Sequence, residues 1–194
     1  VLAVGPGMGI SSESHHFVNA LLRGGRQIVL DADGLNHLAA WGRTRPLPGP
    51  ELVMTPHPGE FARLAQPLGI CGDPTDPVSR PTVAAAMAKA HSAVVVLKGH
   101  RTVVSDGRRM YVNDTGNIAL ASGGSGDILP GLLAAMMAQG MTTFDAAVLA
   151  VYLHGLAADL WAKQQGQSGL TAHDLARQLP QAIEQHRRQM GAIK

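Results

Sequence analysis

The chain has 194 residues, 45% of them hydrophobic, so a single domain, or part of a larger one, can bury a sizeable core. Only 15% of the residues are charged, against about 25% in a typical soluble domain, and this low charge favours a homo-oligomer. A net charge of +2, with 4% aromatic residues and no long basic run, argues against nucleic-acid binding. The lone Cys71 excludes an internal disulfide and a thiolate metal site.

The unbroken apolar runs are far shorter than the roughly 20 residues of a membrane span, and no signal segment precedes the first strand. We therefore expect a cytoplasmic protein without membrane contact. The run Val1–Val4 already has the composition of a buried strand. For this reason we expect residues 1–194 to form one domain that lacks its N-terminal portion.

The first half of the chain alternates short apolar runs with helical segments, as parallel α/β sheets do. Strands are predicted at Val1–Val4, Gln27–Leu30 and Leu52–Thr55, and helices at about 14–23 and 58–65. The turn Gly5–Gly9 follows the first strand, at the edge where open α/β sheets bind ligands, although a turn without a ligand fits equally well. Its spacing departs from the dinucleotide fingerprint at Ile10.

Charged residues follow the second and third strands. Asp31 and Asp33 either cap the next helix, which is the favoured interpretation, or hold a cation through water. Pro58 suits the first position of a helix, and Glu60 suits the third. His57 is not one of the usual capping residues, so we expect its side chain to point into the crevice at the strand ends.

Residues 45–112 contain the predicted centre of the sheet and a predicted hairpin. Connectors rich in Pro and Gly are predicted at 45–50 and 69–81, followed by an alanine-rich helix at 82–90. Ala93–Leu97 is the most apolar strand and is expected at the centre. Asp106-Gly107 predicts a hairpin of 102–105 with 109–112. Lys98 directly follows the central strand, where it is either an unpaired surface lysine or a phosphate ligand.

The glycine-rich stretch Asn117–Leu129 opens a long apolar helix, with Asp127 in its first turn. Free backbone N–H groups and the helix dipole suit an anion at such an end. Ser-Gly-Asp alone, however, favours a helix cap over a catalytic acid. Further helices are predicted at about 144–163, where His154 is expected to be packed and hydrogen-bonded, and at 171–189. Asn113–Thr115 matches a glycosylation acceptor, which has no meaning in a cytoplasmic protein.

Motifs of several other enzyme classes are absent from the sequence. It contains no P-loop, no nucleophile elbow and no H-E-x-x-H pair. Six segments instead point in one direction: Val4–Gly9, Asp31–Asn36, Thr55–Glu60, Val96–Gly99, Gly116–Asp127 and Tyr152–Asp159. Together, and over residues 1 to about 175, they resemble the nucleotide-dependent NAD(P)H-hydrate dehydratases of the ribokinase-like superfamily.

The resemblance implies a three-layer α/β fold, with a mostly parallel central sheet flanked by helices. It also implies the repair of NADHX and NADPHX, the hydrated forms of NADH and NADPH, in their S configuration. ADP, commonly used by bacterial members, or ATP would phosphorylate the ring hydroxyl, and elimination of phosphate would restore the dihydropyridine. Such a transfer needs a phosphate seat, a cation and a base for the hydroxyl proton, and Asp127 beside the glycine loop suits the last role.

Site residues are implied by the same resemblance. The nucleotide would be held by Lys98, Gly99, His100, Arg101, Thr102, Asn117, Gly123, Gly124, Ser125 and Gly126. The hydrate would be contacted by Gly9, His57, Arg63 and Asp127, the last of which is the implied catalytic residue. Glu60 would hold Mg²⁺ through water.

One departure concerns Ile118-Ala119-Leu120, which stands where the family usually has Pro-Gly-Met or Ala-Gly-Met, so the loop backbone is expected to differ. Many bacterial members carry an epimerase domain, which is therefore an expected fusion or partner, and a tetramer is one expected oligomer. Two alternatives stay open: a small-molecule kinase of the superfamily, and a non-catalytic adenine-nucleotide-binding module. The choice between ADP and ATP is also open.

Overall fold

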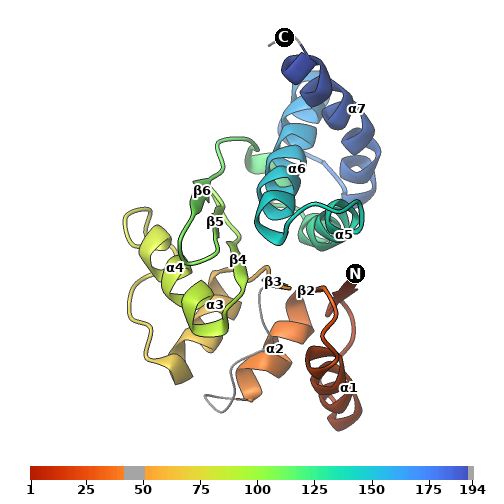
Figure 1. Cartoon of the computed structure of the whole chain (residues 1–194). Coiled ribbons are helices and arrows are strands. Elements are labelled where there is room, and N and C mark those ends of the chain that lie inside the picture. Colours follow the sequence, from red (N-terminus) through yellow and green to blue (C-terminus); the bar gives the residue numbers. More distant parts are fainter. Residues whose placement is uncertain (42–50, 192–194) are drawn as a thin grey trace.

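The computed structural model describes residues 1–41 and 51–191, and the predicted connector at 45–50 lies outside them. Its centre is a six-stranded sheet in which the strands follow one another in chain order (Figure 1). The strands are β1 (Leu2–Val4), β2 (Ile28–Leu30), β3 (Leu52–Met54), β4 (Val94–Leu97), β5 (Val103–Ser105) and β6 (Met110–Val112). β1 to β4 are parallel, and β5 and β6 add antiparallel pairs. The predicted strands and hairpin are confirmed, and β4 lies between β3 and β5 in the interior.

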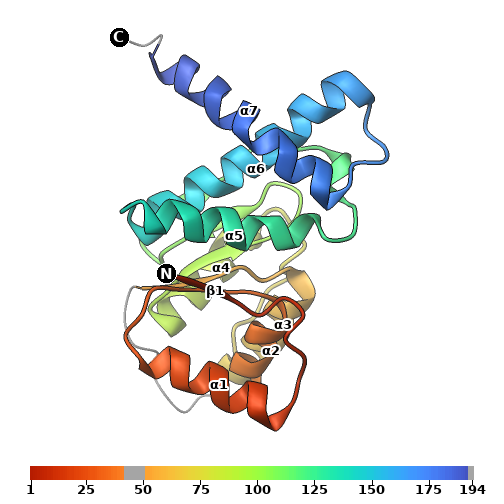
Figure 2. The same ribbon diagram turned by 90° about the vertical axis from the view of Figure 1, so that its right-hand side faces the viewer.

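One face of the sheet is covered by the helices of the N-terminal half (Figure 2). These are α1 (Ser12–Arg23), α2 (Ala32–Ala40), α3 (Pro58–Ala65), the short 3-10 helix η1 (Gln66–Leu68) and α4 (Arg80–His91). Parallel crossovers are right-handed, so strands added in one direction place their connecting helices on one face. The opposite face therefore needs a separate cover.

That cover comes from the C-terminal half. It consists of α5 (Ser125–Ala138), α6 (Thr143–Gln165) and α7 (Ala172–Gly191), which the 3-10 helix η2 (Ile118–Leu120) precedes. Alternate residues of β4 reach the two faces: Val94 and Val96 pack with α5–α7, whereas Val95 and Leu97 pack with α1–α4. Because both faces are buried, β4 is apolar throughout. The predicted three-layer architecture is confirmed.

The composition of α6 follows from its place in the fold. By length and apolarity alone α6 could cross a membrane. In this structure most of its apolar residues are buried inside the protein. The helix packs against α5, α7 and the sheet, so its apolar residues have partners on several sides.

Candidate active site

The predicted ligand-binding residues follow the carboxyl ends of the parallel strands. The turn Gly5–Gly9 follows β1, Asp31 follows β2, His57 lies just beyond β3 and Lys98 follows β4. Figure 2 shows the β1–α1 turn and the N-terminal end of α5 on the same side of the molecule. Open α/β sheets bind ligands at this edge.

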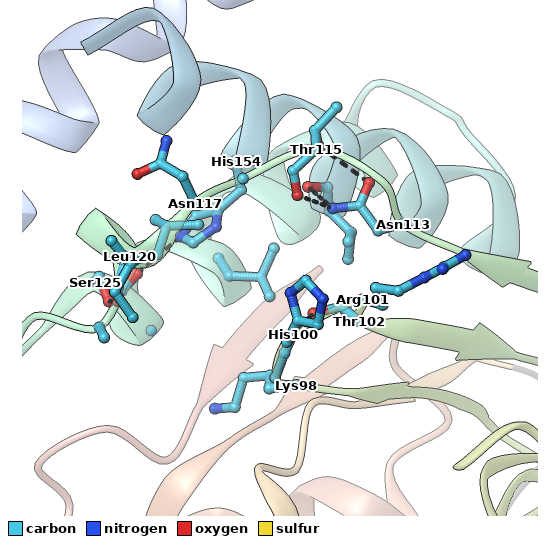
Figure 3. A pocket seen from close by; sticks show the side chains of 18 residues that line it. Lys98, His100, Arg101, Thr102, Asn113, Thr115, Asn117, Leu120, Ser125 and His154 are labelled. Atoms are coloured by element: carbon cyan, nitrogen blue, oxygen red, sulfur yellow. Dashed lines mark hydrogen bonds between the residues drawn. The ribbon is translucent and has the colours of Figure 1, made fainter. Parts of the chain in front are cut away.

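A cavity of about 590 Å³ opens there, within the size range of small-molecule sites (Figure 3). It is lined by the loop after β4, the segment that joins β6 to η2, the first turns of α5 and the middle of α6. The predicted nucleotide-binding residues that line it are Lys98, Gly99, His100, Arg101, Thr102, Asn117, Ser125 and Gly126. The predicted residues Gly123, Gly124, Gly9, His57, Arg63 and Asp127 lie outside its lining.

The N-terminal end of α5 offers free amides beside this cavity. Within residues 1–41 and 51–191, the N–H groups of Gly123, Gly124 and Gly126 have no hydrogen-bond acceptor. Gly124 has φ +81°, a left-handed conformation that favours glycine. The Ser125 hydroxyl lies 2.6 Å from the Leu120 carbonyl oxygen, so it holds the loop from inside. This end therefore has the donors and the dipole of an anion seat.

Lys98 is not the unpaired surface lysine of the first alternative. Its ammonium donates to Asp31 at 2.7 Å and lies 4.0 Å from a Glu60 oxygen, and its side chain is 18% exposed. Nζ is also 4.0 Å from the point where a Cβ on Gly126 would stand. The ammonium group thus lies between two buried carboxylates and the end of α5.

The favoured interpretation of Asp31 and Asp33 as helix caps is wrong. Asp31 occupies the N-cap position of α2, yet its carboxylate makes no capping hydrogen bond and pairs with Lys98. Asp33 accepts a hydrogen bond from the Gly9 amide at 2.9 Å. Tertiary contacts use both acids, which the pattern along the chain could not show.

The argument that His57 is not a cap is also wrong. Its Nδ1 accepts hydrogen bonds from the amides of Gly59 (3.0 Å) and Glu60 (3.4 Å), while Glu60 accepts one from the His57 amide at 2.8 Å. The imidazole therefore replaces the usual Ser or Asp of a capping box. Its side chain is still 52% exposed, so the predicted contact with the hydrate stays a prediction.

Gly9 is held by neighbours on α1 and α2, and Arg63 by a neighbour on α2. The Gly9 carbonyl accepts hydrogen bonds from His37 Nε2 at 3.0 Å and from the Ser14 hydroxyl at 3.1 Å. The Arg63 guanidinium donates to the Asn36 side chain at 3.1 Å. Because the Gly9 amide already binds Asp33, a ligand at this turn would meet a fixed backbone with both polar groups in use. The predicted roles of Gly9 and Arg63 in substrate binding are untested.

Asp127 lies in the first turn of α5, as predicted. The residue is exposed, and its carboxylate has no hydrogen bond or ion pair with any residue in the described part of the chain. A carboxylate without protein partners, one residue beyond Gly126, is free to accept a proton from a ligand. Its assignment as the catalytic base is a prediction.

Part of the cavity wall was missed by the sequence reasoning. Asn113 and Thr115, noted only as a glycosylation pattern, line the cavity together with Gly155 of α6. A Cβ on Gly155 would stand 2.3 Å from the Thr115 hydroxyl oxygen, so this close approach requires glycine. A glycine in the middle of a long helix was the one available signal.

His154 confirms the expectation of a hydrogen-bonded histidine. Its Nε2 is 2.9 Å from the Ser125 carbonyl oxygen, and because a carbonyl only accepts, Nε2 carries the proton. Desolvation lowers the pKa of His154, so the ring is neutral at pH 7. It was expected as a packing residue, but it also lines the cavity and fixes the first turn of α5.

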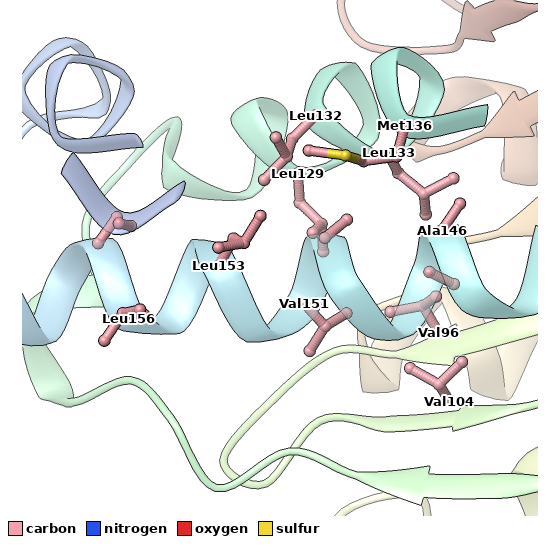
Figure 4. Close-up of a cluster of buried hydrophobic side chains, with 14 of the residues drawn as sticks. Val96, Val104, Leu129, Leu132, Leu133, Met136, Ala146, Val151, Leu153 and Leu156 are labelled. Carbon is pink, nitrogen blue, oxygen red and sulfur yellow. The ribbon is translucent and has the colours of Figure 1, made fainter. Parts of the chain in front are cut away.

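The hydrophobic core fixes the helical walls of the cavity. Leu129 on α5 and Val151 on α6 line the cavity and also belong to the cluster that joins both helices to the sheet (Figure 4). Leu133 and Leu153 continue this contact deeper in the core. Because close-packed interiors resist displacement, the two walls hold a constant separation.

Asp159 clamps the segment that leads into the glycine loop. Its carboxylate accepts hydrogen bonds from the Gly116 amide and the Asn117 side chain, each at 2.8 Å. The Asn117 side-chain oxygen in turn accepts the Ala119 amide at 3.0 Å. The Asn117 side chain thus joins Asp159 to the start of η2. Asp159 is therefore a positioning residue, a role that the sequence did not indicate.

Asp159→Ala should weaken the binding of ADP at least about tenfold, because two donors of the cavity wall lose their acceptor and a loss of this kind costs about 1–3 kcal/mol. Titration calorimetry measures the change. The control is Glu184→Ala, which removes an exposed carboxylate of α7 far from this wall. Unchanged affinity for ADP in the Asp159 variant would show that the clamp does not shape the site.

The residues present fit a magnesium ion that arrives with phosphates. Mg²⁺ takes one or two carboxylates and several waters together with substrate phosphates. No group of three or more His, Cys, Asp or Glu residues that could hold a metal exists in residues 1–41 and 51–191. Glu60 is buried, one of its oxygens accepts a hydrogen bond from the His57 amide and the other lies 3.4 Å from His57 Nε2, so it would contact a metal only through water. Its predicted role stays untested.

Comparisons with known proteins point to one family. A family model described as NAD(P)H-hydrate dehydratase matches residues 1–181. The bifunctional NAD(P)H-hydrate repair enzyme of Moorella thermoacetica is 44% identical over 188 residues, which cover 94% of this chain and 34% of that enzyme. The chain thus spans about a third of the length of such curated relatives.

Solved structures agree with this. ADP/ATP-dependent NAD(P)H-hydrate dehydratase from Bacillus subtilis, co-crystallized with ATP/Mg²⁺, has a TM-score of 0.81 at 33% identity, covering 94% of this chain and 63% of that one. A ribokinase-like superfamily protein from Enterococcus faecalis has a TM-score of 0.77 at 24% identity, covering 94% of this chain and 62% of that one. This similarity supports the predicted ribokinase-like fold. The chain belongs to the NAD(P)H-hydrate dehydratase family.

Proposed function

We propose that this chain carries the ADP- or ATP-dependent dehydration of (S)-NADHX and (S)-NADPHX, a lyase reaction that restores NADH and NADPH. One observation carries the proposal. The cavity is lined by Lys98 and Gly126, the amides of Gly123, Gly124 and Gly126 at this end of α5 have no acceptor among the described residues, and the first turn of α5 carries the exposed Asp127, whose carboxylate has no partner among them either. This combination provides a phosphate seat, a cation and a base.

In the proposed arrangement the nucleoside occupies the cavity and its phosphates reach the end of α5. The free amides and the helix dipole stabilise the phosphate charge, and Lys98 adds a point charge held in place by Asp31. Mg²⁺, bound by the phosphates and through water by Glu60, would neutralise further charge when present. Adenine nucleotide and Mg²⁺ are thus the implied co-substrate and cofactor.

Asp127 then acts on the hydrate. Its carboxylate takes the proton of the ring hydroxyl, whose oxygen forms a bond to the terminal phosphorus of the nucleotide. The bond from that phosphorus to the bridging oxygen breaks, leaving AMP from ADP, or ADP from ATP. Loss of phosphate from the ring, with a proton from the adjacent carbon, completes the double bond. Gly9 and the exposed side chains of His57 and Arg63 would contact the hydrate.

The assay that tests the proposal follows NADH absorbance in the purified protein with hydrated NADH, Mg²⁺ and either ADP or ATP. We expect absorbance to recover with a nucleotide and not without one. Nucleotide consumption only with vitamin precursors that carry a hydroxyl would support the superfamily kinase instead. Binding of ADP without any turnover would support the non-catalytic module. Comparison of the two nucleotides decides between ADP and ATP.

We also propose a cytoplasmic homo-oligomer, a tetramer being one form, with an epimerase domain as its fusion or partner. The low charge and the exposed apolar side chains Ile10 (73%), Phe17 (53%) and Val78 (84%) support self-association. The relative's description as bifunctional supports the second activity. Light scattering of the purified protein measures the oligomer directly.

A further inference from the structure

Arg80, in the first turn of α4, is a buried cation without an acidic partner. Only 5% of the residue is exposed, and its guanidinium forms no ion pair within residues 1–41 and 51–191. It donates instead to the carbonyl oxygens of Pro74 (2.7 Å), Leu97 (2.9 Å) and Lys98 (3.3 Å), and its Nε has no partner. Buried arginines are normally paired, because an uncompensated charge is costly away from water.

The position of this guanidinium relates it to the cavity. The carbonyls of Leu97 and Lys98 are the point where β4 passes into the loop Lys98–Thr102, all of which lines the cavity. A Cβ on Gly99 would stand 3.1 Å from Arg80 Nη1, and Gly99 has φ +137°. The guanidinium therefore packs against Gly99, which lines the cavity, while Arg80 itself lies outside that lining.

Holding a loop by its carbonyls does not require a charge, since a neutral donor can satisfy a carbonyl equally well. A cation placed here without a carboxylate leaves a positive potential on the cavity side of Gly99. An anion in the cavity would compensate it through a low-dielectric wall, where charges interact more strongly than in water. Desolvation lowers the pKa of Arg80, which is consistent with a charge that lacks a partner in the free protein.

We propose that Arg80 is a positioning and electrostatic residue of the nucleotide site: it fixes the loop Lys98–Thr102 from behind and attracts the phosphates of the ligand without touching them. The inference rests on the proposed function, because it requires that the cavity takes a phosphorylated nucleoside. It assigns to α4, on the opposite face of the sheet from α5, a share in binding the anion.

The test measures binding in the absence of the hydrate, by calorimetry with ADP, AMP and adenosine. In Arg80→Met we expect the dissociation constant for ADP to rise roughly tenfold, because its phosphates lose the attraction of the charge. The dissociation constant for AMP should rise less, and that for adenosine should rise by less than about twofold. Arg80→Lys keeps the charge but loses the fork of donors, so it should weaken all three ligands alike and preserve their ratio. Arg108→Met, which removes an exposed charge from the hairpin turn, is the control and should change nothing.

Four results would overturn the inference. If Arg80→Met weakens the binding of ADP and of adenosine equally, Arg80 has a structural role only. If it leaves the binding of ADP unchanged, Arg80 has neither the positioning nor the electrostatic role. If wild-type protein fails to bind ADP, the proposed function falls together with this inference. A thermal melt shows whether Arg80→Met folds. If it does not, Arg80→Lys tests the proposal instead, and a loss of the wild-type preference for ADP over adenosine in that variant contradicts it.

Discussion

Asp127→Asn should abolish the recovery of NADH from its hydrate, while ADP still binds with nearly the wild-type affinity. The amide cannot take the hydroxyl proton, and loss of a general base typically costs about 10²- to 10⁴-fold in rate. The phosphate seat itself consists of backbone amides, which this substitution leaves in place. Parallel measurements of turnover and of ADP binding separate the two effects.

A control exists on the next helix, although its acid, unlike Asp127, accepts a hydrogen bond from Thr142 at 2.6 Å and lies 3.7 Å from Arg109. Asp145 is also an exposed acid in a first turn, that of α6, so Asp145→Asn removes a similar charge from a helix N-terminus away from the cavity. We expect it to keep full activity. Retained turnover in Asp127→Asn would show that another group takes the proton, and equal losses in both variants would point to a loss of stability instead.

Lys98→Met should impair both folding and binding. Asp31 is 1% exposed, and its hydrogen bond to Lys98 is the contact that compensates its charge. Removal of one partner of a buried ion pair typically costs about 3–5 kcal/mol, because the other charge remains unpaired. The variant should also bind ADP more weakly, since the ammonium lies beside the end of α5. Urea unfolding and calorimetry measure the two losses.

A double variant distinguishes them. Asp31→Asn combined with Lys98→Met removes the unpaired charge, so most of the stability should return while the affinity for ADP stays low. A single Lys98 variant that loses less than about 1 kcal/mol would mean that water reaches the pair and screens it. Recovery of ADP affinity in the double variant would contradict the assignment of Lys98 to the phosphate site.

Local patterns predicted the fold well. The apolar runs located each strand of the described sheet within about one residue. For β2, β3 and β4 the reason is that strands buried on both faces must be apolar throughout. Asp106-Gly107 predicted the hairpin through turn chemistry alone. Pro58 and Glu60 located the start of α3, but composition could not show that the imidazole of His57 would complete the capping box.

Contacts between distant segments could not be predicted in the same way. Asp31 and Lys98 stand 67 positions apart and meet only because β2 and β4 end at the same edge of the sheet. The fit of Gly155 against Thr115 likewise joins α6 to the segment after β6. Without these contacts Asp31 looks like a cap, and Asn113–Thr115 looks like an unused glycosylation pattern.

The sequence by itself determined the layered α/β fold, the family and the glycine loop with Asp127 at a helix start, because these depend on periodicity, turn chemistry and motifs that lie within short segments. Only the tertiary structure decided which charges are paired and which groups remain free for a ligand. That balance depends on distances between separate strands and helices. Lys98 is paired with Asp31, whereas within the described residues Asp127 has no partner and the buried Arg80, which packs against Gly99, has no carboxylate.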